Sequence, residues 1–353
     1  MLALQTVTQV PDKVKLLSKR VQGFSKHKKK SFTQDVASTP YEIISTKGRA
    51  RLLYYHSTQK TKHNIYIVPS LINQFYILDL YPGCSLIEEL CREGYDVYLL
   101  DWQKPRPQDQ MASLEKHIFD WLDWGYTTSK ANSKNRKKWS LMGHCIGGTL
   151  TTVYQAVKKH RGLSLINLTA PVDFYDEGIF SLWSRYSSVD LTLMARQWGE
   201  IHHEFLQYSF KLSTPLAEIK KWKHLWQNSH TESYLKRFAC INHWIKDQMP
   251  FPGIAYKEFI EDFYQKNLLI KNKLIIGDHQ ISLSSIKSPI LVLTAKGDTV
   301  VKHTSAIALR EHVSAPVIHH EIPGGHIGCL LSSKARANIV HQINQFTGEG
   351  YVQ

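Results

Sequence analysis

One short turn constrains the fold of this chain more than any other feature. The segment Gly143-His144-Cys145-Ile146-Gly147-Gly148 follows an apolar run and opens a helical stretch. Its Gly-x-Cys-x-Gly spacing is that of a nucleophile elbow with Cys in place of Ser, and the flanking glycines allow a sharp strand-to-helix turn. The pattern predicts a thiol held above a helix N-terminus, where the thiolate is favoured. The alternative is that Cys145 is a buried structural thiol in a tight turn.

Two later loops supply partners for this thiol. The apolar run 290–294 ends at Gly297-Asp298, which places a carboxylate at the carboxyl edge of a sheet, and His326 lies in the glycine-rich loop after the last predicted strand. The order nucleophile, acid, histidine is that of α/β hydrolases. We therefore expect Cys145, Asp298 and His326 to form a catalytic triad. Taken singly, Asp298 is also explained as a turn residue, and His326 as one loop histidine among eighteen in the chain.

Acyl transfer also needs N–H groups that stabilise a negatively charged oxygen. The backbone N–H of Ile146, directly after the nucleophile, is the first expected donor. The second donor in this fold comes from the loop after an early strand, here Val68-Pro69-Ser70-Leu71-Ile72-Asn73. We expect that donor to be the N–H of Leu71 or Ile72.

Strand and helix signals alternate in two parts of the chain, residues 36–172 and 287–353. Such alternation predicts an α/β core in which helices cover both faces of a mostly parallel sheet, the α/β-hydrolase fold. Strands are predicted at 41–46, 50–55, 65–68, 95–100, 139–142, 163–168, 290–294 and 317–322, and helices at 74–92, 112–129, 147–160 and after residue 330.

Residues 173–286 interrupt this alternation and are rich in aromatic side chains. We interpret this stretch as a mainly helical cap that covers the active site. The alternative is that its aromatic residues form the core of a helical subdomain. Its tryptophans are Trp183, Trp198, Trp222, Trp226 and Trp244.

The first 35 residues form a basic segment, and residues 11–25 within it have the pattern of an amphipathic helix. This end lacks the apolar stretch of a signal peptide, and no apolar run reaches the roughly 18 residues of a membrane span. The five cysteines form no metal-type CxxC pair, and their odd number fits reduced thiols. We expect a cytoplasmic protein without a transmembrane segment, metal or cofactor.

The formal net charge of +14 comes largely from two clusters, residues 13–30 and 130–138. An excess of positive charge attracts polyanions: nucleic acid, an anionic membrane surface, or the phosphates of a coenzyme A thioester. It is equally explained as a solvated basic surface. No nucleic-acid-binding motif accompanies the charge, so we expect no nucleic acid partner.

Several stretches together resemble the polyhydroxyalkanoate synthases, and most closely the short catalytic subunit of the two-subunit class III enzymes. The resemblance covers roughly residues 35–345. Two residues depart from the family pattern, Gln74 at a position of Lys and Thr299 at a frequent position of His. The stretches that carry it are VPSLINQFYILDL (68–80), GYDVYLLDW (94–102), GHCIGG (143–148), NLTAPVDF (167–174), the run before the acid strand (255–277) and GGHIG (324–328).

This resemblance implies an enzyme that polymerises (R)-3-hydroxyacyl-CoA, with 3-hydroxybutyryl-CoA as the first candidate, and releases CoA through an acyl-Cys145 intermediate. It also implies a second synthase subunit, a homodimer, and a location on polyhydroxyalkanoate granules with the growing polyester. The basic residues Lys134 to Lys138 are candidates for attracting the CoA phosphates.

Two other functions remain open at this point. One is a Cys-dependent esterase or thioesterase of the same fold, against which the I-N-x-x-Y-I-L-D-L block argues. The other is an inactive granule-associated scaffold protein, against which the complete set Cys145, Asp298 and His326 argues.

Overall fold

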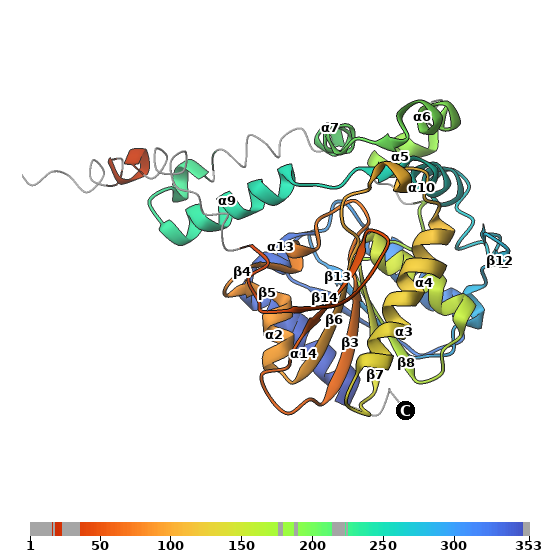
Figure 1. The fold of residues 1–353 in the computed structure, drawn as a ribbon. Coiled ribbons are helices and arrows are strands. Elements are labelled where there is room, and N and C mark those ends of the chain that lie inside the picture. Colours follow the sequence, from red (N-terminus) through yellow and green to blue (C-terminus); the bar gives the residue numbers. More distant parts are fainter. Residues whose placement is uncertain are drawn as a thin grey trace, which may run out of the picture.

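An eight-stranded sheet runs through the body of the molecule, with helices on both of its faces (Figure 1). The computed structural model describes residues 16, 18–22, 36–175, 179–186, 190–213, 223 and 225–348. Most of the predicted basic segment 1–35, with much of the amphipathic helix expected at 11–25, lies outside these residues. Residues 18–22 within it are helical.

The strand order follows the α/β-hydrolase arrangement expected from the sequence. The first two strands pair antiparallel, β2 pairs antiparallel with β6, and the remaining pairs are parallel. All eight predicted strands are confirmed. In their order across the sheet they are β1 (Glu42–Lys47), β2 (Ala50–Tyr55), β6 (Tyr95–Asp101), β3 (His63–Val68), β7 (Trp139–His144), β8 (Leu163–Leu168), β13 (Ile290–Ala295) and β14 (Val317–Ile322).

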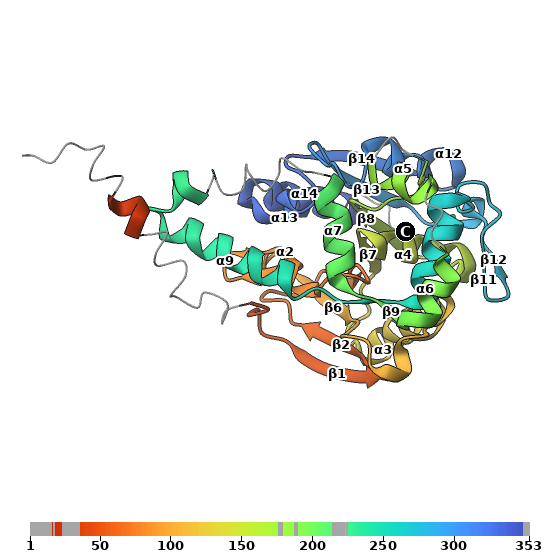
Figure 2. The same ribbon diagram turned by 90° about the horizontal axis from the view of Figure 1, so that it is seen from above.

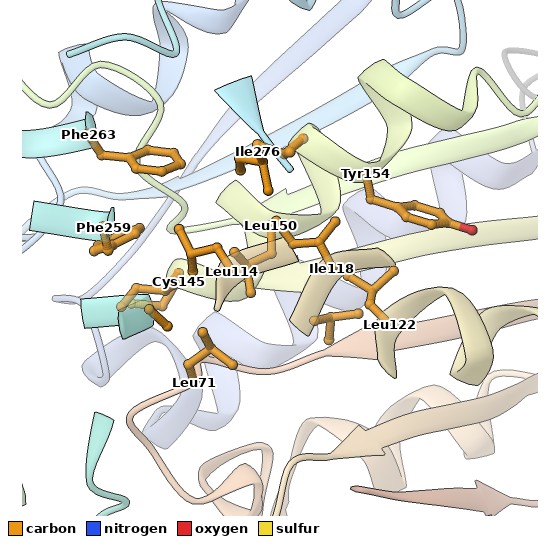
Figure 3. Packing of buried hydrophobic residues seen from close by; sticks show 14 of the residues in the cluster. Leu71, Leu114, Ile118, Leu122, Cys145, Leu150, Tyr154, Phe259, Phe263 and Ile276 are labelled. Atoms are coloured by element: carbon orange, nitrogen blue, oxygen red, sulfur yellow. The ribbon is translucent and has the colours of Figure 1, made fainter. Parts of the chain in front are cut away.

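Central strands are buried along their whole length because helices cover both faces of the sheet. Alternate residues of β3 therefore enter two cores: Tyr66 and Val68 face one, Ile65 and Ile67 the other. Figure 3 shows part of the first core, which includes Cys145. The first core is covered by η4 (Lys116–Leu122), α3 (Asp123–Asn132) and α4 (Ile146–Lys158), and the second by α2 (Leu86–Arg92) and α14 (Ser333–Gly348).

The single helix predicted over residues 74–92 is wrong. The chain forms a 3-10 turn, η2 (Phe75–Leu78), then two short strands, β4 (Asp79–Tyr81) and β5 (Cys84–Ser85), and only then α2. Pro82 and Gly83 make the turn between these strands, with Gly83 at φ +78°. The Ser85 hydroxyl then caps α2 by accepting the Glu88 N–H at 2.9 Å. The Pro-Gly pair is a turn signal that overrides the apolar helical pattern.

The described residues of the segment 173–286 are mainly helical, as predicted, although the boundaries of a separate cap stay a prediction. Helices α5, α6, α7 and α10 lie above the carboxyl ends of the parallel strands, and α9 extends sideways from the body (Figures 1 and 2). The elements are α5 (Ile179–Tyr186), α6 (Leu191–Trp198), β9 (Glu200–Ile201), α7 (His203–Ser213), α9 (Glu232–Lys246), β10 (Phe251–Pro252), α10 (Gly253–Glu258), η5 (Phe259–Gln265), β11 (Ile275–Ile276), β12 (His279–Gln280) and η6 (Leu283–Ser285).

The tryptophans of this segment do not share one environment. Trp244 is buried, whereas Trp198 is 48% exposed and Trp226 is 38% exposed. The side chain of Trp183 and the whole of Trp222 lie outside the described part. Among the described helices, none combines the length and apolar character needed to cross a membrane.

Candidate active site

The elbow around Cys145 has the backbone geometry that its glycines predict. Cys145 has φ +54° and ψ −129° and stands directly before α4, with its N–H donating to the Leu168 carbonyl at 3.0 Å. A Cβ on Gly147 would lie 2.1 Å from the Val68 carbonyl oxygen. A Cβ on Gly143 would lie 2.2 Å from the Gly148 Cα. Only glycine fits at these two positions, so the sequence imposes the strained turn.

Asp298 and His326 meet at the same edge of the sheet, at the ends of β13 and β14. His326 Nδ1 donates to Asp298 Oδ2 at 2.8 Å, and both side chains are nearly buried. The other carboxylate oxygen, Oδ1, accepts the N–H groups of Val300 at 2.8 Å and Val301 at 2.9 Å, which fixes the orientation of the acid. The Cys145 thiol is the third side chain at this point, because it lines the same cavity as His326 and interacts with it electrostatically. The three side chains expected to form a triad therefore lie together, and two of them, His326 and Asp298, are hydrogen-bonded.

The charge state of His326 follows from its two neighbours. Burial alone lowers the pKa of His326, but the negative charge of Cys145 and the hydrogen bond to Asp298 outweigh burial and raise that pKa to about 10. An imidazolium beside a thiolate is the activated pair of cysteine nucleophiles. His144 contributes no positive charge, because burial and the nearby His326 lower its pKa to about 3.

The residues expected to donate to an oxyanion lie around the nucleophile. Ile146 is the first residue of α4, where backbone N–H groups have no partner within the helix. Leu71 and Ile72 are buried in the same apolar core as Cys145, and Figure 3 labels Leu71 and Cys145 within it. The assignment of these N–H groups as oxyanion donors stays a prediction.

Two cavities adjoin Cys145. The larger, of about 270 Å³, has a mostly apolar wall to which the end of α9 and one side of α7 contribute. The smaller, of about 50 Å³, lies on the side of Ile146. Ile72, Leu206 and Val300 line both. Further side chains of the larger cavity are Asn73, His203, Gln207, Trp244, Ile245, Gln248, Met249, His326 and Ile327, and those of the smaller are Ile146, Pro171, Phe251, Tyr256, Phe259, Ile260, Tyr264 and Val301.

Sequence reasoning missed most of these lining residues. His203, Gln207 and Gln248 carry no motif and reach the site only through the packing of the cap helices. Asn73 lies within the family-like segment 68–80, but nothing in that segment's pattern marks its side chain as part of a cavity wall. No three His, Cys, Asp or Glu side chains are grouped to hold a metal ion in the parts of the chain that the structure describes.

The basic cluster at 130–138 does not lie beside these cavities. Strand β7 begins at Trp139, directly after the cluster, and ends at His144, directly before Cys145. Six residues of strand span about 20 Å. Lys134 to Lys138 therefore lie at the opposite edge of the sheet from Cys145, and their attraction of the coenzyme A phosphates stays a prediction.

Comparisons with known proteins agree with this architecture. The sequence model described as "alpha/beta hydrolase fold" matches residues 64–332, and the one described as "Poly-beta-hydroxybutyrate polymerase (PhaC) N-terminus" matches residues 12–90. The solved structure of DcsB in complex with its substrate analogue superposes with a TM-score of 0.52 at 16% identity, covering 89% of this chain and 100% of that one. The fold class is therefore the α/β-hydrolase fold.

Two curated relatives define the family more closely. The "Poly(3-hydroxyalkanoate) polymerase subunit PhaC" of Synechocystis sp. is 31% identical over 89% of this chain and 85% of its own length. The protein of the same name from Haloferax mediterranei is 29% identical over 89% of this chain, which spans 65% of that relative. This chain belongs to the PhaC family of poly(3-hydroxyalkanoate) polymerase subunits, a family of acyltransferases, and the resemblance noted in its sequence is confirmed.

Proposed function

We propose that this chain polymerises (R)-3-hydroxyacyl-CoA thioesters, such as (R)-3-hydroxybutyryl-CoA, into a polyester and releases coenzyme A. The observation that carries the proposal is the buried, hydrogen-bonded pair of His326 and Asp298 beside the Cys145 thiol. This arrangement couples a nucleophile, a proton carrier and an orienting carboxylate. The same geometry also occurs in α/β hydrolases, in which water accepts the acyl group. Membership of the family is therefore the reason for assigning a polymer hydroxyl, and not water, as the acceptor.

In the first half-reaction the Cys145 thiolate attacks the thioester carbonyl carbon. The oxyanion that forms is stabilised by the N–H of Ile146 and an N–H of Leu71 or Ile72. When the intermediate collapses, the bond to the coenzyme A sulfur breaks and the acyl group stays on Cys145. His326 gives its proton to the departing thiolate, so free coenzyme A leaves as a thiol.

In the second half-reaction the 3-hydroxyl of an incoming unit or of the growing chain attacks the acyl group on Cys145. Its proton passes to His326 or Asp298, the new C–O ester bond forms, and the Cys145 thiolate leaves. A thiol nucleophile suits this cycle because the acyl-enzyme is itself a thioester. The equilibrium constant for acylation by the coenzyme A thioester is therefore close to one. The mostly apolar cavities beside Cys145 favour the polymer hydroxyl over water.

The small cavity next to Ile146 is the proposed pocket for the side chain of the acyl unit. Its volume of about 50 Å³ and its wall of Phe259, Ile260 and Tyr264 leave room for a short alkyl group only. We therefore assign short-chain 3-hydroxyacyl units to this site, with 3-hydroxybutyryl as the first substrate to test.

The protein is proposed to act in the cytoplasm at the surface of polyhydroxyalkanoate granules, together with a second synthase subunit and as a homodimer. Support comes from the family and from apolar side chains exposed on the cap. Leu182, Tyr186, Leu193 and Trp198 are each between 40% and 78% exposed on α5 and α6.

Purified protein incubated with (R)-3-hydroxybutyryl-CoA tests the proposal. We expect release of free thiol together with turbidity from insoluble polymer, and loss of both in the Cys145→Ala variant. Thiol release with soluble 3-hydroxybutyrate as the sole product would show that water is the acceptor, so the protein would be a thioesterase. If no thiol is released even after the candidate second subunit is added, a scaffold role replaces the enzymatic one.

A further inference from the structure

A side-chain acceptor in the larger cavity is left unused by the described part of the chain. Asn73 follows Ile72 in the loop after β3 and lines the cavity together with Cys145 and His326. Its Nδ2 donates to Gln248 Oε1, whereas its Oδ1 accepts no hydrogen bond from the described residues. In a cavity whose wall is mostly apolar, such an acceptor is a recognition group for a ligand donor.

The orientation of this carboxamide follows from a chain of hydrogen bonds. Gln248 Nε2 donates to the main-chain carbonyl of Trp244, which can only accept. The Gln248 amide therefore presents its Oε1 to Asn73, and that oxygen in turn requires the nitrogen of Asn73. Asn73 Oδ1 is therefore the carboxamide atom that stays available to accept a hydrogen bond from a ligand.

The loop that carries Asn73 is also held on both sides. The Met249 N–H donates to the Ile72 carbonyl at 3.2 Å, and Trp244 Nε1 donates to the Gln74 carbonyl at 2.9 Å. Gln248 itself is 7% exposed. The end of α9 and the residues after it thus fix the main chain before and after Asn73 and also its side chain, as a preorganised binding group requires.

The substrate class of the proposed function has one donor that must be recognised close to Cys145. The carbon that carries the 3-hydroxyl is separated from the thioester carbonyl carbon by a single methylene, so the hydroxyl enters the same chamber as the reacting carbon. A hydroxyl brought into an apolar cavity without a partner loses its hydrogen bonds to water, and an acceptor offsets that loss. Resting on the proposed function, we infer that Asn73 Oδ1 accepts a hydrogen bond from the 3-hydroxyl of the acyl group loaded onto Cys145, with Gln248 as the positioning residue.

Single-turnover acylation tests this inference. Coenzyme A release and the mass of acylated protein are followed with (R)-3-hydroxybutyryl-CoA and with butyryl-CoA, which has the same chain without the hydroxyl. We expect Asn73→Leu to slow acylation by the hydroxyacyl thioester about 10- to 100-fold, the effect of one lost hydrogen bond, and to change butyryl-CoA acylation less than about threefold.

The Gln248 variants probe the same group by a second route. Gln248→Met removes the acceptor that holds Asn73 and should reproduce the selective loss. Gln248→Glu keeps an oxygen for Asn73 Nδ2 and should retain most of the preference for the hydroxyacyl thioester. The matched control is Gln207→Met, in the same cavity, whose amide donates to the Ile245 carbonyl; it should affect both thioesters by the same factor.

The outcomes distinguish a failure of this inference from a failure of the proposed function. If Asn73→Leu and Gln248→Met slow both thioesters equally, Asn73 shapes the loop or contacts coenzyme A, and the hydroxyl assignment is overturned. If neither thioester acylates Cys145 in the unsubstituted protein, the proposed function itself fails and the inference falls with it. Should Asn73→Leu not fold, as judged by circular dichroism, the two Gln248 variants still decide the question.

Discussion

The charge on His326 is set by two side chains that lie far from it in the sequence. Cys145 and Asp298 were both predictable, because each sits in a glycine-rich turn at the end of an apolar run. The same reasoning did not find Gln248, since no local pattern distinguishes this glutamine, just after the end of α9, from any other. Sequence motifs thus locate groups whose backbone must be special, and miss groups that act only through tertiary contact.

A titration of His326 follows from its neighbours. We expect its imidazolium to persist to about pH 10 in the intact protein, because the negative charge of Cys145 stabilises it. In the Cys145→Ala variant that charge is gone, so the pKa of His326 should fall. The measurement is the pH dependence of its ring signals by NMR. A midpoint near 6.5 in the intact protein would contradict the ion pair.

At the scale of elements, strands were easier to predict than the links between them. Each buried strand is a short apolar run bounded by turn residues, and all eight were found. The stretch 74–92 failed because its apolar spacing suits a helix, whereas the turn at Pro82 and Gly83 divides it. The short pair β9 and β10 carries no recognisable pattern, because two residues per strand are too few to show a period.

The contact between α4 and the loop after β3 gives a prediction at this scale. Gly147→Ala places a Cβ 2.1 Å from the Val68 carbonyl oxygen and 2.6 Å from the Pro69 carbonyl oxygen. Two backbone segments must separate to admit it, which should lower the free energy of unfolding by about 3 kcal/mol. Urea denaturation measures the change. Gly328→Ala is the control, since its added Cβ meets nothing within 4 Å; equal stability of the two variants would refute the close contact.

For the molecule as a whole, buried histidines link stability to pH. Burial is the main reason that the pKa of His63 is lowered to about 4 and the pKa values of His117 and His144 to about 3. Below pH 6.5 these rings are protonated in the unfolded chain but stay neutral in the folded chain. The free energy of unfolding therefore decreases as the pH is lowered below 6.5. Three such groups give a slope of up to about 4 kcal/mol per pH unit near pH 5.

His326 acts in the opposite direction. Its folded pKa of about 10 lies above that of the unfolded chain, so its contribution is complete below pH 6.5 and is lost as pH rises toward 10. Considering these histidines, we expect the free energy of unfolding to be largest near pH 6.5. Urea denaturation at pH 5, 6.5 and 9 measures this. A stability that is unchanged between pH 6.5 and 5 would show that the three buried rings are protonated in the folded state.

The basic loops at the amino edge of the sheet have a practical consequence for handling the molecule. The adjacent strands β3, β7, β8 and β13 are each preceded by a loop with exposed cations. Cys145 lies at the opposite, carboxyl edge of the sheet. Adsorption on a negatively charged bead would therefore be oriented, with the reactive end turned outward and accessible to dissolved thioester. The exposed cations on these loops are Lys60, Lys62, Lys134, Arg136, Lys137, Lys138, Lys159, Arg161 and Lys287. An immobilised catalyst could thus be prepared without a covalent tether.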